Sequence, residues 1–128
     1  MVRCVLIALT WLAIATPVLA APRPLSAGEF LTRAEPLLKK SKMSLVFSKE
    51  ARRLMAALGE AAQHNRSRLD AEKAAGRKVD TCLPEKGKAK VNANDLLAHI
   101  RSLPPAQKAQ SFDAAFASYT AKKYPCRA

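Results

Sequence analysis

The stretch 49–75 constrains the fold of this chain more than any other part of the sequence. Ser48 can cap a helix that begins there, and Gly76 can end it. Polar residues such as Arg52 and Asp70 fall between apolar ones and can stay in water. The apolar side chains recur at intervals of three, four and seven residues, as on one face of an α-helix: Leu54, Met55, Leu58, Ala61, Ala62 and Leu69. We therefore expect one long amphipathic helix that forms the backbone of the domain.

Two shorter helical patterns flank this element. Ser26 and Glu29 form a capping box that opens a helix over 27–40, which Pro36 should kink or shorten. The apolar residues 43–47 then form a link. After an irregular loop over 76–92, Asn92 or Asn94 caps a short third helix.

A fourth helix is predicted after the second proline of "SLPPAQK", because Pro105 suits the first turn of a helix. Ala109, Phe112, Phe116 and Tyr119 then share one face. The chain is rich in alanine, leucine and lysine and poor in β-branched residues, which favours helix over sheet. We expect an all-α fold, a small four-helix domain over 21–128.

The N-terminus has the three parts of a secretory signal peptide. Arg3 precedes an apolar run, and "VLA" ends at a small residue, so cleavage should fall between Ala20 and Ala21. The rival interpretation is a membrane anchor, but the run is shorter than the roughly 20 residues that span a bilayer. We expect export, with 1–20 removed.

Cleavage would remove Cys4 and leave Cys82 and Cys126 in an oxidising compartment, where disulfides persist. A redox pair would place its cysteines closer together, as in C-x-x-C. With His64 and His99 the chain would have the two cysteines and two histidines of a zinc site, but no pair of them has the local spacing of a zinc module. We therefore expect a structural disulfide that ties the central loop to the C-terminus, no metal site and no cofactor.

No catalytic constellation stands out. His64 lies between Gln63 and Asn65 and is expected to be solvated, and His99 beside Leu97 should sit at the edge of the core. The sequence has no G-x-S-x-G, H-E-x-x-H or phosphate-binding glycine loop. We do not expect an enzyme.

The formal net charge of +12, or +11 without Arg3, indicates an anionic partner. The cations are spread over every segment and not gathered with aromatic residues, so we do not expect nucleic-acid binding. The stretch "EKGKAK", Glu85 to Lys90, has two interpretations. It is either a mobile connector or a contact loop that Cys82 anchors at one end.

The whole stretch "TCLPEKGKAKVNANDLLAHIRSLPPAQKAQSFDAAFASYTAKKYPC" resembles the Rap/Tai family of type VI secretion amidase immunity proteins. "EFLTRAEPLLKK" and "AEKAAGRK" resemble the N-terminal half of that family. The residues that match its pattern are Cys82, Pro84, Tyr124, Pro125 and Cys126.

The resemblance implies a small helical periplasmic protein with its two cysteines bridged. Members of the family bind and inhibit a secreted peptidoglycan amidase effector, a loop of the immunity protein enters the groove of the toxin, and homodimers occur. By position, the contact residues here would be Glu85, Lys86, Lys88, Lys90, Asn92 and Asn94. The charge departs from this pattern, because like charge would oppose binding to a basic effector. The alternative is a cationic envelope protein that binds anionic polymers.

Overall fold

The computed structural model describes residues 23–127, so the predicted signal peptide and Cys4 lie outside the described residues. The fold is all-α, as expected. Within 23–127 there are six helices and no strand, only two isolated backbone bridges. No helix in this range is long and apolar enough to cross a bilayer. The helices are α1 (Ala27–Leu38), α2 (Lys42–Phe47), α3 (Lys49–Ala74), α4 (Ala93–Ser102), α5 (Pro105–Lys108) and α6 (Phe112–Lys123).

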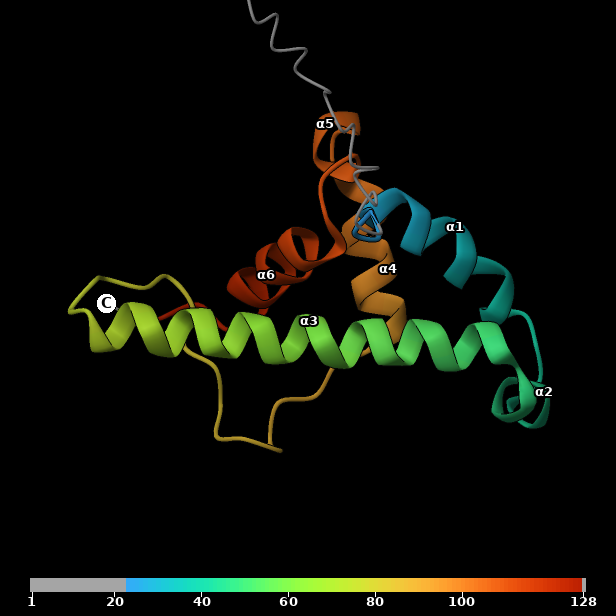
Figure 1. The fold of residues 1–128 in the computed structure, drawn as a ribbon, viewed down its shortest axis with the longest axis horizontal. Helices are drawn as coiled ribbons and strands as arrows, with labels where there is room; N and C mark the ends of the chain where they lie inside the picture. Colours follow the sequence, from blue (N-terminus) through green and yellow to red (C-terminus); the bar gives the residue numbers. More distant parts are fainter. Residues whose placement is uncertain (1–22, 128) are drawn as a thin grey trace, which may run out of the picture.

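The long helix α3 runs along the whole molecule, and the other helices are arranged around it (Figure 1). Helices α1 and α6 both pack against α3, and α4 packs against α1 and α6. The short helix α2 sits at one end of α3, and the loop between α3 and α4 hangs from the opposite side to α1 and α5. This arrangement leaves two features away from the core, α2 and the loop.

The predicted caps of α1 and α3 are confirmed. The Ser26 N–H donates to the Glu29 carboxylate at 3.0 Å, and the Glu29 N–H donates to the Ser26 hydroxyl at 3.1 Å. The bond from the Ser26 backbone lowers the pKa of Glu29. Ser48 accepts the N–H of Ala51 at 3.2 Å and so caps α3.

The predicted count of four helices was too low in two places. The "apolar link" 43–47 is the helix α2, because the Ser41 hydroxyl accepts the Ser44 N–H at 3.3 Å and caps it. The predicted fourth helix is two helices, α5 and α6. Between them the chain pairs with the segment before α1: the Ala27 N–H donates to Gln110 and the Phe112 N–H donates to Leu25. Ala109 is therefore outside the aromatic face that it was predicted to share, and it is exposed.

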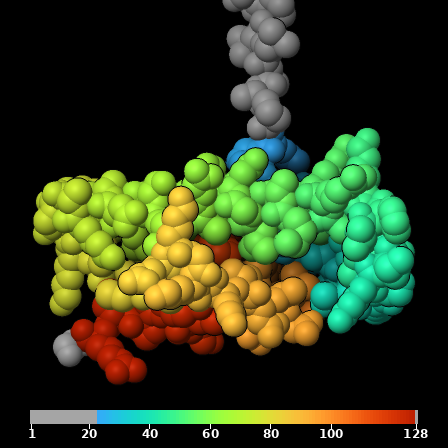
Figure 2. Space-filling view, turned by 90° about the horizontal axis from the view of Figure 1, so that it is seen from below, coloured from blue at the N-terminus to red at the C-terminus, as the bar shows by residue number. Residues whose placement is uncertain are grey.

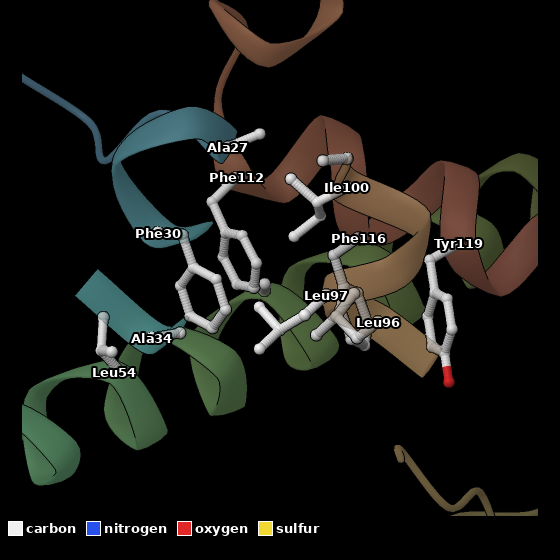
Figure 3. Close-up of a cluster of buried hydrophobic side chains, with 12 residues drawn as sticks. Ala27, Phe30, Ala34, Leu54, Leu96, Leu97, Ile100, Phe112, Phe116 and Tyr119 are labelled. Atoms are coloured by element: carbon white, nitrogen blue, oxygen red, sulfur yellow. The ribbon is translucent and has the colours of Figure 1, made fainter. Parts of the chain in front are cut away.

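The core lies where α1, α3, α4 and α6 meet (Figure 3). The rings of Phe30 and Phe112 stack with their centroids 3.8 Å apart. Phe116 and Tyr119 continue the buried face of α6 toward α4. One core contact is polar, since the buried Asn65 amide donates to the Thr120 hydroxyl at 2.8 Å. The core therefore joins the N-terminal half of the chain to its C-terminal half.

Candidate functional site

The predicted disulfide closes the base of the loop between α3 and α4. Cys82 and Cys126 are bonded, with their Cα atoms 4.9 Å apart. The Cys82 N–H donates to the Tyr124 carbonyl at 2.9 Å, and the Cys126 N–H donates to the Asp80 carbonyl at 3.0 Å. The C-terminal segment thus pairs with the loop on both sides of the bridge. This is the first of three ties that hold the loop.

The second tie comes from α3. The guanidinium group of Arg66 donates to the carbonyl of Pro84 at 2.9 Å. A hydrogen bond from a charged donor is stronger than one between neutral groups. It fixes the chain two residues beyond Cys82, before the exposed part of the loop begins.

The third tie lies at the far end of the loop. The Lys90 carbonyl accepts a hydrogen bond from the Lys123 ammonium at 2.8 Å and from the Tyr124 hydroxyl at 3.2 Å. Lys123 also donates to the Tyr119 hydroxyl, and this contact raises the pKa of Lys123. Tyr124, one of the residues that match the family pattern, takes part in two of the ties. Its carbonyl accepts the Cys82 N–H in the first tie, and its hydroxyl donates to the Lys90 carbonyl in the third.

Between the second and third ties the chain makes a tight turn. The Lys88 N–H donates to the Glu85 carbonyl at 2.9 Å, and the two side chains form an ion pair. Gly87 has φ +86°, a conformation that side chains with a Cβ rarely adopt. The turn presents Glu85, Lys86 and Lys88 to solvent. We name residues 85–88 the loop tip.

The six predicted contact residues lie in four places. Glu85, Lys86 and Lys88 form the loop tip, and Lys90 lies at the third tie with its side chain exposed. Asn92 caps α4, because its side-chain oxygen accepts the N–H groups of Asn94 and Asp95. Asn94 is exposed in the first turn of α4. The loop tip, the Lys90 side chain and Asn94 are therefore exposed, and only the loop tip is held by ties on both sides.

A cleft of about 620 Å³ separates the loop from the helices beside it. Arg66 and Asp70 of α3 line one wall, and Lys86 and Val91 of the loop line the other. Three aromatic side chains, Phe116, Tyr119 and Tyr124, also line it. The amber atoms of the loop cover the middle of the face shown in Figure 2. The loop and this cleft together form the candidate site.

The two histidines have partners that the sequence did not indicate. His64 on α3 is exposed, and its Nδ1 lies 2.8 Å from the carboxylate of Asp113 on α6. No serine, threonine or cysteine hydrogen-bonds to the His64 ring within the described chain. Likewise, no group of three or more His, Cys, Asp or Glu side chains in 23–127 could hold a metal ion.

His99 on α4 bonds through Nε2 to the Ser118 hydroxyl of α6 at 2.8 Å. The Ser118 hydroxyl itself donates to the Ala115 carbonyl, so His99 must be the donor in its bond to Ser118. The proton then sits on Nε2, and the buried Nδ1 has no partner within 23–127. Burial, with a smaller effect from Lys122, lowers the pKa of His99. The predicted place at the edge of the core is confirmed.

An exposed apolar surface around α2 was not predicted from the sequence. Met55 was predicted to face the core, but 66% of it is exposed. Phe47 is 77% exposed, Met43 72% and Val46 66%, and Leu38 at the end of α1 is also exposed. We name these five residues the α2 patch. In Figure 1 α2 lies at one end of α3, whereas the loop between α3 and α4 hangs below the middle part of α3.

No protein-family model matches this chain, and no curated protein or solved structure gives a significant match to it. The resemblance to the Rap/Tai family therefore stays a prediction.

Proposed function

We propose that this protein is a periplasmic immunity protein that binds and inhibits a peptidoglycan amidase effector of a type VI secretion system. The observation that carries the proposal is the loop tip, which is exposed and yet held by ties on both sides. The pattern of residues 82–126 supports the class of partner, because it resembles the Rap/Tai family.

The three ties fit a loop that inhibits by occupying a groove. Ordering a free loop on binding costs about 0.5–1.5 kcal/mol for each side chain that is immobilised, and a loop ordered beforehand avoids part of this cost. The disulfide fixes one side of the tip, and the bonds from Lys123 and Tyr124 to Lys90 fix the other. An inhibitor of this kind needs a loop tip whose shape and charge match the groove of the effector, and it needs no reacting group.

A second candidate is a cationic envelope protein that binds anionic polymers such as lipopolysaccharide or acidic wall polymers. The side chains of Lys86 and Lys90 favour it, because neither has an ion-pair partner within the described residues. Charge of one sign on a surface attracts a polyanion without specific contacts. Binding of this kind weakens steeply with salt.

Affinity capture separates the two candidates. The oxidised protein is expressed from the full chain together with any amidase effector encoded beside it, and the bound material is identified at low and moderately high salt. The proposal expects an effector that stays bound at high salt in fixed stoichiometry and loses amidase activity. Recovery of acidic polymer alone, released by salt, would refute the immunity function and favour the second candidate.

A further inference from the structure

The α2 patch borders an apolar groove of about 370 Å³ between α1, α2, α3 and α4. Leu38, Val46 and Met55 of the patch line it, together with core side chains such as Phe30 and Leu97. Arg52 is the only charged residue among those that line the groove. Soluble proteins rarely expose contiguous apolar surface of this kind without a binding role.

The charges around the patch are almost all positive. Between residues 38 and 55 the only acid is Glu50, and it pairs with Arg33 of α1 at 3.7 Å. The cations are exposed, and none of them has an ion-pair partner within 23–127. They are Lys39, Lys40, Lys42, Lys49, Arg52 and Arg53.

We propose that the α2 patch docks the protein onto the surface of a membrane that contains anionic phospholipid. Met43 and Phe47 insert at the boundary between headgroups and acyl chains, the surrounding lysines and arginines contact the lipid phosphates, and the groove receives part of an acyl chain. A short apolar helix face within a ring of cations is the pattern of an interfacial membrane anchor. The site is separate from the loop tip and does not depend on the proposed inhibitor function.

The charge argues against a second copy of this chain as the occupant. In a two-fold dimer the same patch lies on both subunits, so the six cations of one copy would face those of the other. Like charges placed against each other oppose association. An anionic membrane instead complements both the apolar centre and the positive rim.

The shape of the patch favours a membrane over a peptide. Val46 contributes to the wall of the groove, but Met43 and Phe47 do not line it and are the two most exposed large apolar residues of the described chain. In Figure 2 α2 belongs to the rounded lobe at the right-hand end of the molecule. A convex apolar projection can enter a lipid interface, whereas a peptide would be held by the groove alone.

Vesicle co-sedimentation tests the proposal with protein expressed from the full chain and purified in its oxidised form. The probes are vesicles of phosphatidylcholine alone and vesicles with roughly a third phosphatidylglycerol, an anionic lipid. We expect binding to the anionic vesicles and little to the neutral ones. Val46→Ser with Phe47→Ser should weaken binding about tenfold, because the apolar area that enters the interface is lost. Lys40→Glu with Lys42→Glu should weaken it comparably through charge.

Matched controls change similar residues away from the patch. Val91→Ser alters an exposed apolar residue of the loop, and Arg77→Glu with Lys78→Glu reverses two exposed cations beyond α3. Both should bind vesicles within about twofold of the parent, because neither changes the α2 patch or the cations beside it. The variant Phe47→Trp should still bind anionic vesicles, and its tryptophan fluorescence emission should shift to shorter wavelength when they are added. The parent protein, measured in the same way, serves as the blank.

Three results would overturn the proposal. The first is equal vesicle binding by the parent and by Val46→Ser with Phe47→Ser. The second is a change in the oligomeric mass of that variant without vesicles, which would make the patch an interface between copies. The third is loss of effector capture by the same variant with unchanged vesicle binding, which would assign the patch to a protein partner. Failure of the inhibitor function alone leaves the vesicle results unchanged.

Discussion

At the scale of single residues, we expect His99 to make the stability of the fold depend on pH. Its Nε2 donates to Ser118, so a second proton would have to go on the buried Nδ1, which has no partner within 23–127. Burial therefore lowers its pKa from the ordinary 6.5. The unfolded chain binds more protons than the folded chain between the lowered value and 6.5.

We expect the contribution of His99 to the free energy of unfolding to be complete above pH 6.5 and to decline as the pH falls through the lowered pKa. His99→Gln keeps a donor for Ser118 but does not titrate, so it should remove this part of the pH dependence. Urea unfolding at several pH values from 5 to 7.5 measures it. His64→Gln is the matched control, and it should retain the slope due to His99. An unchanged slope in His99→Gln would refute this account.

At the scale of helices, Ser48 serves two elements. It ends α2, and its hydroxyl accepts the Ala51 N–H at the start of α3. Ser48→Ala should lower the free energy of unfolding by about 1 kcal/mol, because one N–H of the first turn loses its partner. Ser48→Asp supplies another capping oxygen and should stay close to the parent. Chemical denaturation compares the three, and equal stability of the alanine variant would mean that solvent replaces the cap.

Local patterns in the sequence predicted those helices whose apolar face meets the core. The capping serine and the periodicity of α3 placed its start at Lys49 and its end within one residue of Ala74. The same reasoning failed at α2, because a helix of six residues is too short for its apolar period to be recognised, and two of its apolar side chains, Met43 and Phe47, face water. Met55 was misplaced for a different reason: it follows the predicted apolar stripe of α3, yet its side chain is exposed beside α2.

Apart from the disulfide, the contacts between distant segments were not predicted from the sequence. The break between α5 and α6 depends on pairing of residues 25–27 with 110–112, which no local pattern of 105–123 contains. The bond of His64 to Asp113 and the ties of Lys90 to Lys123 and Tyr124 are likewise long-range. The loop was predicted as a candidate site from its composition and its cysteine. Its second and third ties could not be predicted, because they are hydrogen bonds to residues distant in the sequence.

At the scale of the whole molecule, the disulfide joins the loop to the C-terminal segment that follows α6, across a sequence separation of 44. Replacing both cysteines, Cys82→Ser with Cys126→Ser, should lower the free energy of unfolding by about 4 kcal/mol, because the unfolded chain gains the freedom of the opened loop. Thermal and urea unfolding measure the loss. A loss below about 1 kcal/mol would mean that the hydrogen bonds of Arg66, Lys123 and Tyr124 hold the loop without the bridge.

The most direct test of the central claim is a titration of effector amidase activity with the oxidised protein and with the variant Lys86→Glu with Lys88→Glu. Both lysines lie on the exposed loop tip, so the variant should fold normally. The matched control is Arg77→Glu with Lys78→Glu, which makes the same change of charge outside the ties. The account predicts that the parent and the control abolish activity at equal stoichiometry, and that the loop-tip variant inhibits at least about tenfold less well. Equal inhibition by all three proteins, or no inhibition by the parent, would contradict it.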